Sequence, residues 1–135
     1  MQKGRLGFIG LALGMILFSQ TVLAACDGGT EFTGKNGKTF CVSDVSVHWW
    51  GAFAWCESQG MKLASMDDIC YISEEERWLG GSASGSCPNV VSMGPNKWAW
   101  SSLGSGTTNA YRVNLSSGEV DDIFYRYYTY YAVCQ

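Results

Sequence analysis

The chain has 135 residues, with nine Lys and Arg against twelve Asp and Glu, and a formal net charge of −3. Its first 24 residues hold two of the basic residues and none of the acidic ones, so the remainder has seven basic against twelve acidic residues, a net charge of −5. Nucleic acid, anionic lipid and sulfated polysaccharide are bound by basic surfaces, so this charge excludes them as the main partner.

The first residues predict export. Lys3 and Arg5 precede an uncharged apolar run of 13 residues, Leu6 to Phe18. This pattern is typical of a signal peptide, and the run is too short to cross a bilayer as a helix, which needs about 20 apolar residues. We therefore expect residues 1–24 to be a signal peptide, and residues 25–135 to form one domain in the periplasm, at the cell surface or outside the cell.

Two processing sites compete at the end of this segment. Residues 22–24 (Val-Leu-Ala) have the small-residue spacing for cleavage before Ala25, whereas residues 23–26 (Leu-Ala-Ala-Cys) resemble a bacterial lipoprotein box. In the second interpretation Cys26 carries a lipid anchor, and five cysteines remain, so that one lacks a partner. The even count of six cysteines favours the first interpretation, with three disulfides.

A hairpin and a helix are predicted next. The pair Asn36-Gly37 between short β-prone runs predicts a β-hairpin over residues 30–42. Apolar residues at i, i+3, i+4 and i+7 then predict an amphipathic helix from an N-cap at Ser46 to a C′ residue at Gly60. The single histidine, His48, has a capping or surface role at its start. The apolar stripe consists of Trp49, Ala52, Phe53 and Cys56, and Trp50 and Trp55 lie off it.

A second helix is predicted to begin after an N-cap at Ser65, three residues before a carboxylate. Residues 73–76 (Ser-Glu-Glu-Glu) repeat this capping signal and predict a helical turn with solvated carboxylates. Residues 80–96 are rich in Gly, Ser, Asn and Pro, which indicates irregular structure around Cys87.

The rest of the chain alternates between apolar and polar residues and predicts strands. A loop is expected over residues 104–109 and a turn over residues 116–118 (Ser-Ser-Gly). The strands form an antiparallel meander, and together with the helices they predict an α+β domain. The predicted strands cover residues 97–101, 111–115, 120–125 and 129–134.

Several motifs resemble those of C-type lectin-like domains. Residues 49–57 (Trp-Trp-Gly-Ala-Phe-Ala-Trp-Cys-Glu) followed by residues 60–65 (Gly-Met-Lys-Leu-Ala-Ser) resemble the first-helix signature of that family. Residues 98–101 (Trp-Ala-Trp-Ser) resemble its Trp-x-Trp strand, and residues 130–135 (Tyr-Tyr-Ala-Val-Cys-Gln) its closing strand, whose cysteine pairs with the first helix.

The second half also resembles a bacterial branch of the family, found at the C-terminus of collagen-like adhesins. The matching motifs run in the same order as in that branch and end at Cys134. They are residues 100–102 (Trp-Ser-Ser), 110–113 (Ala-Tyr-Arg-Val) and 116–118 (Ser-Ser-Gly).

The resemblance implies a C-type lectin-like fold, with two helices packed on an antiparallel sheet, an N-terminal hairpin and three disulfides. The implied bridges are Cys26–Cys41, Cys56–Cys134 and Cys70–Cys87. Only nine residues separate Trp100 from Ala110, so the family's long loop is shortened. The chain also lacks the triplet with which family members bind sugar through calcium, since residues 94–96 read Gly-Pro-Asn.

Calcium-dependent sugar binding therefore stays only an alternative, and we expect no cofactor. Glu119, Asp121 and Asp122 are the carboxylates that would supply oxygens to calcium.

The candidate binding site is a tyrosine-rich run near the C-terminus. Tyrosine offers a large rigid contact area with a polar tip, and recognition surfaces concentrate it together with Arg and Asp. Part of this run is therefore expected to be an exposed patch that binds a surface protein or glycan. The predicted ligand-binding residues are Asp121, Asp122, Tyr125, Arg126, Tyr127, Tyr128 and Tyr130.

Enzyme activity is not expected. We expect all six cysteines to be in disulfides, which would leave no thiol nucleophile, and no oxyanion or triad motif surrounds a serine. Spacings typical of zinc ligands, such as Cys-x-x-Cys, are missing from the sequence. The function predicted from sequence is thus an adhesin-like binding module, with a periplasmic structural or inhibitor protein, lipid-anchored at Cys26, as the alternative.

Overall fold

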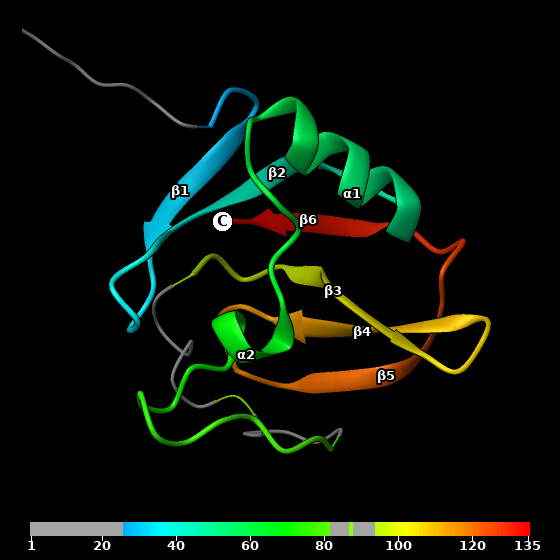
Figure 1. Cartoon of the computed structure of the whole chain (residues 1–135). Helices are drawn as coiled ribbons and strands as arrows, with labels where there is room; N and C mark the ends of the chain where they lie inside the picture. The colour runs from blue at the N-terminus through cyan, green and yellow to red at the C-terminus, as the bar shows by residue number, and fades with distance from the viewer. Residues whose placement is uncertain (1–25, 82–86, 88–93) are drawn as a thin grey trace, which may run out of the picture.

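The structure is a computed structural model and describes residues 26–81, 87 and 94–135. The predicted signal peptide therefore lies outside the described residues. The predicted hairpin is confirmed: β1 (Gly29–Thr33) pairs antiparallel with β2 (Thr39–Val47), as Figure 1 shows. Gly37 in its turn has a φ of 80°, a conformation that glycine adopts without a steric clash.

Helix α1 (Trp49–Ser58) begins later than the sequence predicts. Ser46 is not its N-cap, because β2 continues through Val47 and takes Ser46 into the sheet. His48 is the N-cap instead, and its Nδ1 accepts a 3.0 Å hydrogen bond from the backbone N–H of Gly51. The predicted end is confirmed, since Gly60 follows the helix with a φ of 72°.

Helix α2 (Met66–Ile69) is a single turn capped as predicted by Ser65, whose Oγ accepts a hydrogen bond from the N–H of Asp68. The similar signal at Ser73 produces no helix, so that prediction is wrong. Ser73 Oγ does accept hydrogen bonds from the N–H groups of Glu75 and Glu76. Capping satisfies the first donors of a turn but does not propagate it, because each helix needs further backbone bonds to offset its nucleation cost.

The strands of the second half are β3 (Trp98–Ser105), β4 (Asn109–Asn114), β5 (Val120–Tyr125) and β6 (Tyr130–Cys134). In the described part of the chain they complete a six-stranded sheet with the order β1-β2-β6-β3-β4-β5. The antiparallel meander is confirmed for β3 to β5. It is wrong for β6, which lies between β2 and β3 and runs parallel to β3, so the sheet is mixed. Residue alternation indicates which side of a strand is buried but not which strand lies beside it.

The expected loop over residues 104–109 is much shorter in the structure. Gly104 pairs with Ala110, and Ser105 with Asn109, so the two strands continue almost to the turn. Residues 106–108 alone form the turn, with Gly106 at a φ of 63°. The segment between Trp100 and Ala110, for which the resemblance implies a shortened long loop, is therefore a tight hairpin.

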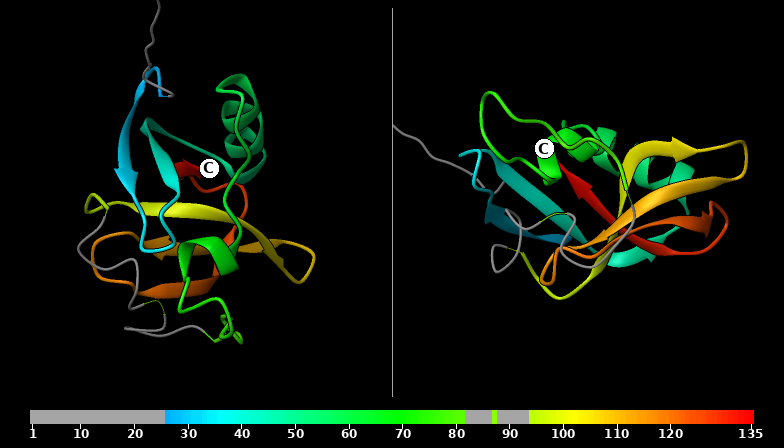
Figure 2. Two further views of the ribbon diagram at one scale, coloured as in Figure 1. Left: turned by 60° about the vertical axis from the view of Figure 1, so that its left-hand side comes forward. Right: turned by 90° about the horizontal axis from the view of Figure 1, so that it is seen from below.

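The core consists of two apolar clusters on the two sides of the central strands. Successive residues of a strand point to opposite sides, so Ala99 joins the cluster that contains α2, and Trp100 joins the cluster that contains α1. In the left view of Figure 2, the chain end at β6 lies between the first hairpin and α1. Leu63 adds an isolated antiparallel bridge to Cys134, next to β6.

Three disulfides join these elements, in the pairing that the resemblance implies: Cys26–Cys41, Cys56–Cys134 and Cys70–Cys87. Such bonds form and persist in oxidising compartments, in agreement with export. A lipid on Cys26 would leave Cys41, which is fully buried, without its partner. Among the described residues, no helix is long and apolar enough to span a membrane.

Candidate recognition surface

The connection between β5 and β6, residues 126–129, lies beside the first turn of α1. Figure 1 shows it rising from the end of β5 toward the nearer end of that helix, where it enters β6. The backbone N–H of Trp49 donates a 3.0 Å hydrogen bond to the carbonyl of Arg126, which fixes the helix start against the connection. The predicted tyrosine-rich run and the N-terminus of α1 therefore form one surface.

Three tyrosines of the predicted site are exposed on this surface. The exposed fractions are 42% for Tyr125, 65% for Tyr127 and 56% for Tyr128. The ring centroids of Tyr125 and Tyr127 are 5.2 Å apart, and those of Tyr125 and Tyr128 are 6.3 Å apart. These rings are close enough to support one another in a single contact surface.

Trp50 also belongs to this surface, although it was not among the predicted residues. Its side chain is 43% exposed, and its ring centroid lies 5.0 Å from that of Tyr127. The sequence carried a signal for it, because Trp50 lies off the apolar stripe of α1. We call the group of Trp50, Tyr125, Tyr127 and Tyr128 the aromatic patch.

Tyr130 does not belong to the aromatic patch. It packs against the α1 cluster, with its ring centroid 5.0 Å from that of Trp100 and 5.7 Å from that of Phe124. Tyr130 is the first residue of β6 and pairs with Val47. The strand therefore turns its side chain inward, and its predicted contact with a ligand has no support in this arrangement.

Asp121 is engaged inside the protein. Its Oδ2 lies 3.7 Å from the guanidinium of Arg112, whose side chain is only 12% exposed. That guanidinium lies among three aromatic rings, 3.4 Å from the centroid of Phe124, 3.9 Å from that of Trp98 and 4.5 Å from that of Tyr130. Cation–π attraction and the one carboxylate thus balance a largely buried charge.

Asp122 lies on the other side of β5, as the next residue along the strand. There its negative charge acts on Tyr111: burial first, and then the charge and hydrogen bonding of Asp122, raise the pKa of the Tyr111 phenol. The side chains of Asp121 and Asp122 therefore lie on opposite sides of β5, and these two carboxylates cannot bind one calcium ion together. The described residues hold no group of three or more acidic, His or Cys side chains arranged for a metal ion.

Arg126 holds the surface together. Its Nε donates a 2.8 Å hydrogen bond to the carbonyl of Asn109, and its Nη2 a 3.1 Å bond to that of Gly106. The guanidinium also lies 4.3 Å from the ring centroid of Trp49. Arg126 thus joins the β3–β4 turn, the β5–β6 connection and α1, so its guanidinium has a structural role.

No family model matches this chain, and a search of curated proteins found no match either.

A pocket of about 330 Å³ lies on another part of the surface, bordered by α2 and β3, and it contains none of the aromatic patch residues. Its lining consists of Ser65, Met66, Asp67, Trp78, Ser102 and Leu103. The side chains of the aromatic patch are themselves exposed, whereas an enclosed small-molecule site would bury most of its ligand.

Gly104 is required for the Arg126 contacts. A methyl group at this position would collide with the Arg126 guanidinium, which two carbonyl groups hold in place. Gly104→Ala is expected to lower the free energy of unfolding by about 1–3 kcal/mol, the usual cost of overpacking. Urea denaturation measures the loss, and Thr107→Ala, on the exposed turn nearby, should change stability by less than about 0.5 kcal/mol. Equal effects of the two variants would contradict the role assigned to Gly104.

Proposed function

We propose that this chain is an exported, non-catalytic binding module of the C-type lectin-like type, which recognises a surface protein or glycan through the aromatic patch. The observation that carries the proposal is the exposure of four large aromatic side chains in mutual contact. Soluble proteins rarely expose a contiguous apolar patch of several hundred Å², and such patches often mark a site where a partner binds.

The order of elements supports the lectin-like part of the proposal. The first hairpin lies next to the last strand, and the disulfide Cys56–Cys134 joins the first helix to that strand, as the resemblance implies. The motif residues Trp100 and Ala110 are fully buried in the same cluster. They therefore have structural roles, whereas the side chains of the aromatic patch are exposed.

The size of the aromatic patch is suited to the centre of an interface. Exposed fractions of 42–65%, on side chains that can each bury about 150–250 Å², give an area on the order of 400 Å². A stable interface covers about 800 Å² on each partner, with a few large residues at its centre providing most of the binding energy. Tyrosine and tryptophan are the residue types most often found at such centres.

Binding should not depend on calcium. The aromatic patch contains no carboxylate, and Arg126 beneath it is bonded to backbone carbonyls. An uncharged aromatic surface acts by contact area and hydrogen bonding at its phenol tips, which requires no ion.

The proposal of a non-catalytic module is supported by the disulfide bonding of all six cysteines and by His48, whose Nδ1 caps α1.

A binding experiment on arrays tests this function. The domain is applied to arrays of glycans and of purified surface proteins, once with calcium and once with a chelator. We expect binding that is indifferent to chelator, and that Trp50→Ala or Tyr127→Ala weakens at least about tenfold, as hot-spot residues do. Leu79→Ala is the matched control, because Leu79 is a 96% exposed apolar side chain outside the aromatic patch. Calcium-dependent binding, or binding that survives replacement of all four rings by alanine, would overturn the proposal.

A further inference from the structure

The four rings of the aromatic patch form a connected row. The ring centroid of Trp50 lies 5.0 Å from that of Tyr127, which lies 5.2 Å from that of Tyr125. Tyr125 in turn lies 6.3 Å from Tyr128. The ring planes at these three contacts are inclined to one another by 52°, 43° and 71°, so the exposed rings form a ridged strip.

The aromatic patch offers hydrogen-bond donors and carries no charge. The indole N–H of Trp50 only donates, and the phenols of the three tyrosines can donate or accept. Of the charged residues predicted beside it, Asp121 pairs with Arg112, and Arg126 donates hydrogen bonds to two backbone carbonyls. An uncharged ligand with free acceptors therefore complements this surface.

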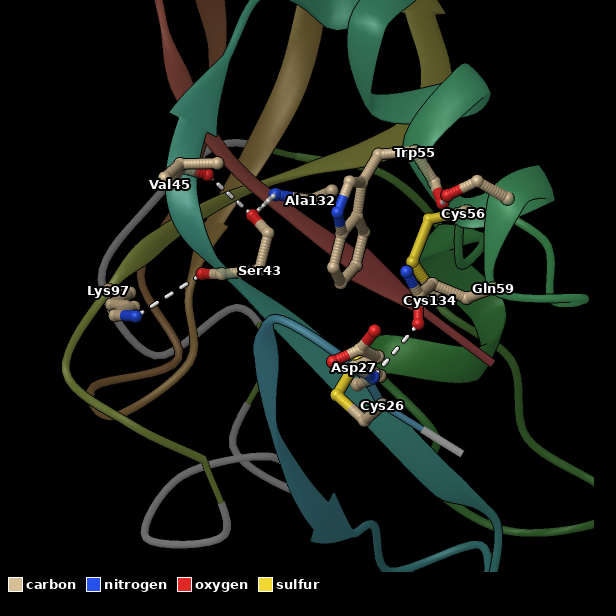
Figure 3. The surroundings of a disulfide bond; sticks show 12 residues. Cys26, Asp27, Ser43, Val45, Trp55, Cys56, Gln59, Lys97, Ala132 and Cys134 are labelled. Atoms are coloured by element: carbon tan, nitrogen blue, oxygen red, sulfur yellow. Dashed lines mark hydrogen bonds between the residues drawn. A yellow bond between two sulfur atoms is a disulfide. The ribbon is translucent and has the colours of Figure 1, made fainter. Parts of the chain in front are cut away.

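Trp50 differs from the other two tryptophans of α1. Trp49 donates its indole N–H to the carbonyl of Ser101 over 2.8 Å. Trp55 packs against the α1 cluster, and Figure 3 shows its ring beside the disulfide Cys56–Cys134. Trp50 is 43% exposed and is the most exposed of the three. It is therefore the tryptophan of α1 that a ligand can contact most widely.

The area of the aromatic patch suits a short linear segment better than a globular partner. Four such rings expose on the order of 400 Å², which is about half of the roughly 800 Å² that each partner covers in a stable protein–protein interface. A second copy of this chain would also bring together two domains that each have a net charge of −5. A ligand that buries so little surface has to lose little conformational entropy on binding, so it should already have its bound shape.

We propose that the partner of the aromatic patch is a proline-rich segment of a surface protein, bound as a polyproline II helix. This inference rests on the proposed function, because it names the ligand class of the same site. The polyproline II helix forms before binding and presents apolar proline rings, for which aromatic side chains are the usual contact surface. Proline has no backbone N–H, and the helix leaves its carbonyl groups free. The segment thus accepts the hydrogen bonds that Trp50 and the phenols donate.

The length of the row fixes the length of the segment. The three centroid separations allow a row of at most about 17 Å, and polyproline II rises about 3.1 Å per residue. Five or six residues therefore cover the aromatic patch, on the order of two turns of the ligand helix.

Titration of the ¹⁵N-labelled domain with octaproline, capped at both ends, tests this inference by nuclear magnetic resonance. We expect the indole N–H signal of Trp50 to shift, while the indole signals of Trp49 and Trp55 stay in place. The control peptide alternates Gly and Ser over the same length and is a flexible coil, so it should bind at least about tenfold more weakly. Equal affinity for the two peptides, or a Trp50 signal that does not move, would overturn the inference.

Two ring variants place octaproline on the aromatic patch. Trp50→Ala and Tyr127→Ala should each weaken its binding at least about tenfold, and Leu79→Ala should leave it unchanged. Tyr127 lies in the connection between β5 and β6, so its truncation leaves α1 in place even if Trp50→Ala does not fold. Octaproline that binds the folded Tyr127→Ala domain as tightly as the original one contradicts the inference.

The arrays distinguish failure of this inference from failure of the proposed function. If the aromatic patch binds a glycan or a surface protein but not octaproline, the inference is wrong and the proposed function stands. If octaproline does not bind and array binding survives replacement of all four rings by alanine, both are wrong.

Discussion

Replacing Cys56 and Cys134 together by alanine is expected to lower the free energy of unfolding by about 4 kcal/mol. The bond joins residues separated by 78 positions, and the entropy that a disulfide removes from the unfolded chain increases with the length of the closed loop. Both residues are fully buried, so alanine is used to avoid leaving a polar atom without a partner. Urea denaturation followed by tryptophan fluorescence measures the loss.

The other two disulfides are the matched controls for this measurement. They join residues separated by 15 and 17 positions, for which the same entropy argument gives about 3 kcal/mol each. We expect Cys26→Ala/Cys41→Ala and Cys70→Ala/Cys87→Ala to be less destabilising than the removal of Cys56–Cys134. The reverse order would mean that local packing around each bond, rather than chain entropy, determines its contribution.

Elements that depend on neighbouring residues could be predicted from the sequence. The turn at Gly37, the cap at Ser65 and the end of α1 at Gly60 each require a particular residue type at one position, and all three are as predicted. The start of α1 could not be predicted in this way. Ser46 has a good capping side chain, but its backbone is taken by the pairing of β2 with β6, which involves residues far away in the sequence.

The same reason explains the position of β6. Its alternating residues predict a strand equally well at the edge of a meander or between β2 and β3. The structure places it in the centre, where one side of the strand faces each apolar cluster: Ala132 faces one and Val133 the other. The cysteine pairing was the signal for this position, since it joins the last strand to the first helix, but it came from the resemblance and not from the residue pattern.

The candidate site was predicted in part. The exposure of Tyr125, Tyr127 and Tyr128 agrees with the expectation of an outward-facing group of tyrosines. Charged residues nearby were assigned to the ligand because Asp and Arg accompany tyrosine at interfaces, but a sequence does not show which charges neutralise one another inside the protein. Asp121 pairs with Arg112, which comes from a neighbouring strand.

Asp121→Asn is expected to lower the free energy of unfolding by about 2 kcal/mol, because Arg112 then keeps its charge without a carboxylate. Breaking a fully buried ion pair costs about 3–5 kcal/mol, and the estimate is lower here because the Asp121 side chain is 26% exposed. Arg112 Nε has no hydrogen-bond partner, so only the cation–π contacts with the three rings would remain to compensate the charge. Urea denaturation of the single variant measures the loss.

The double variant Arg112→Met/Asp121→Asn distinguishes a structural pair from a ligand-binding carboxylate. Methionine fills much of the same space among Phe124, Trp98 and Tyr130 without a charge, so the double variant should recover most of the stability lost in Asp121→Asn. Binding through the aromatic patch should be unchanged in both variants once each is folded. If Asp121→Asn leaves stability intact and abolishes binding, Asp121 is a recognition residue, and its contact with Arg112 only positions it for the ligand.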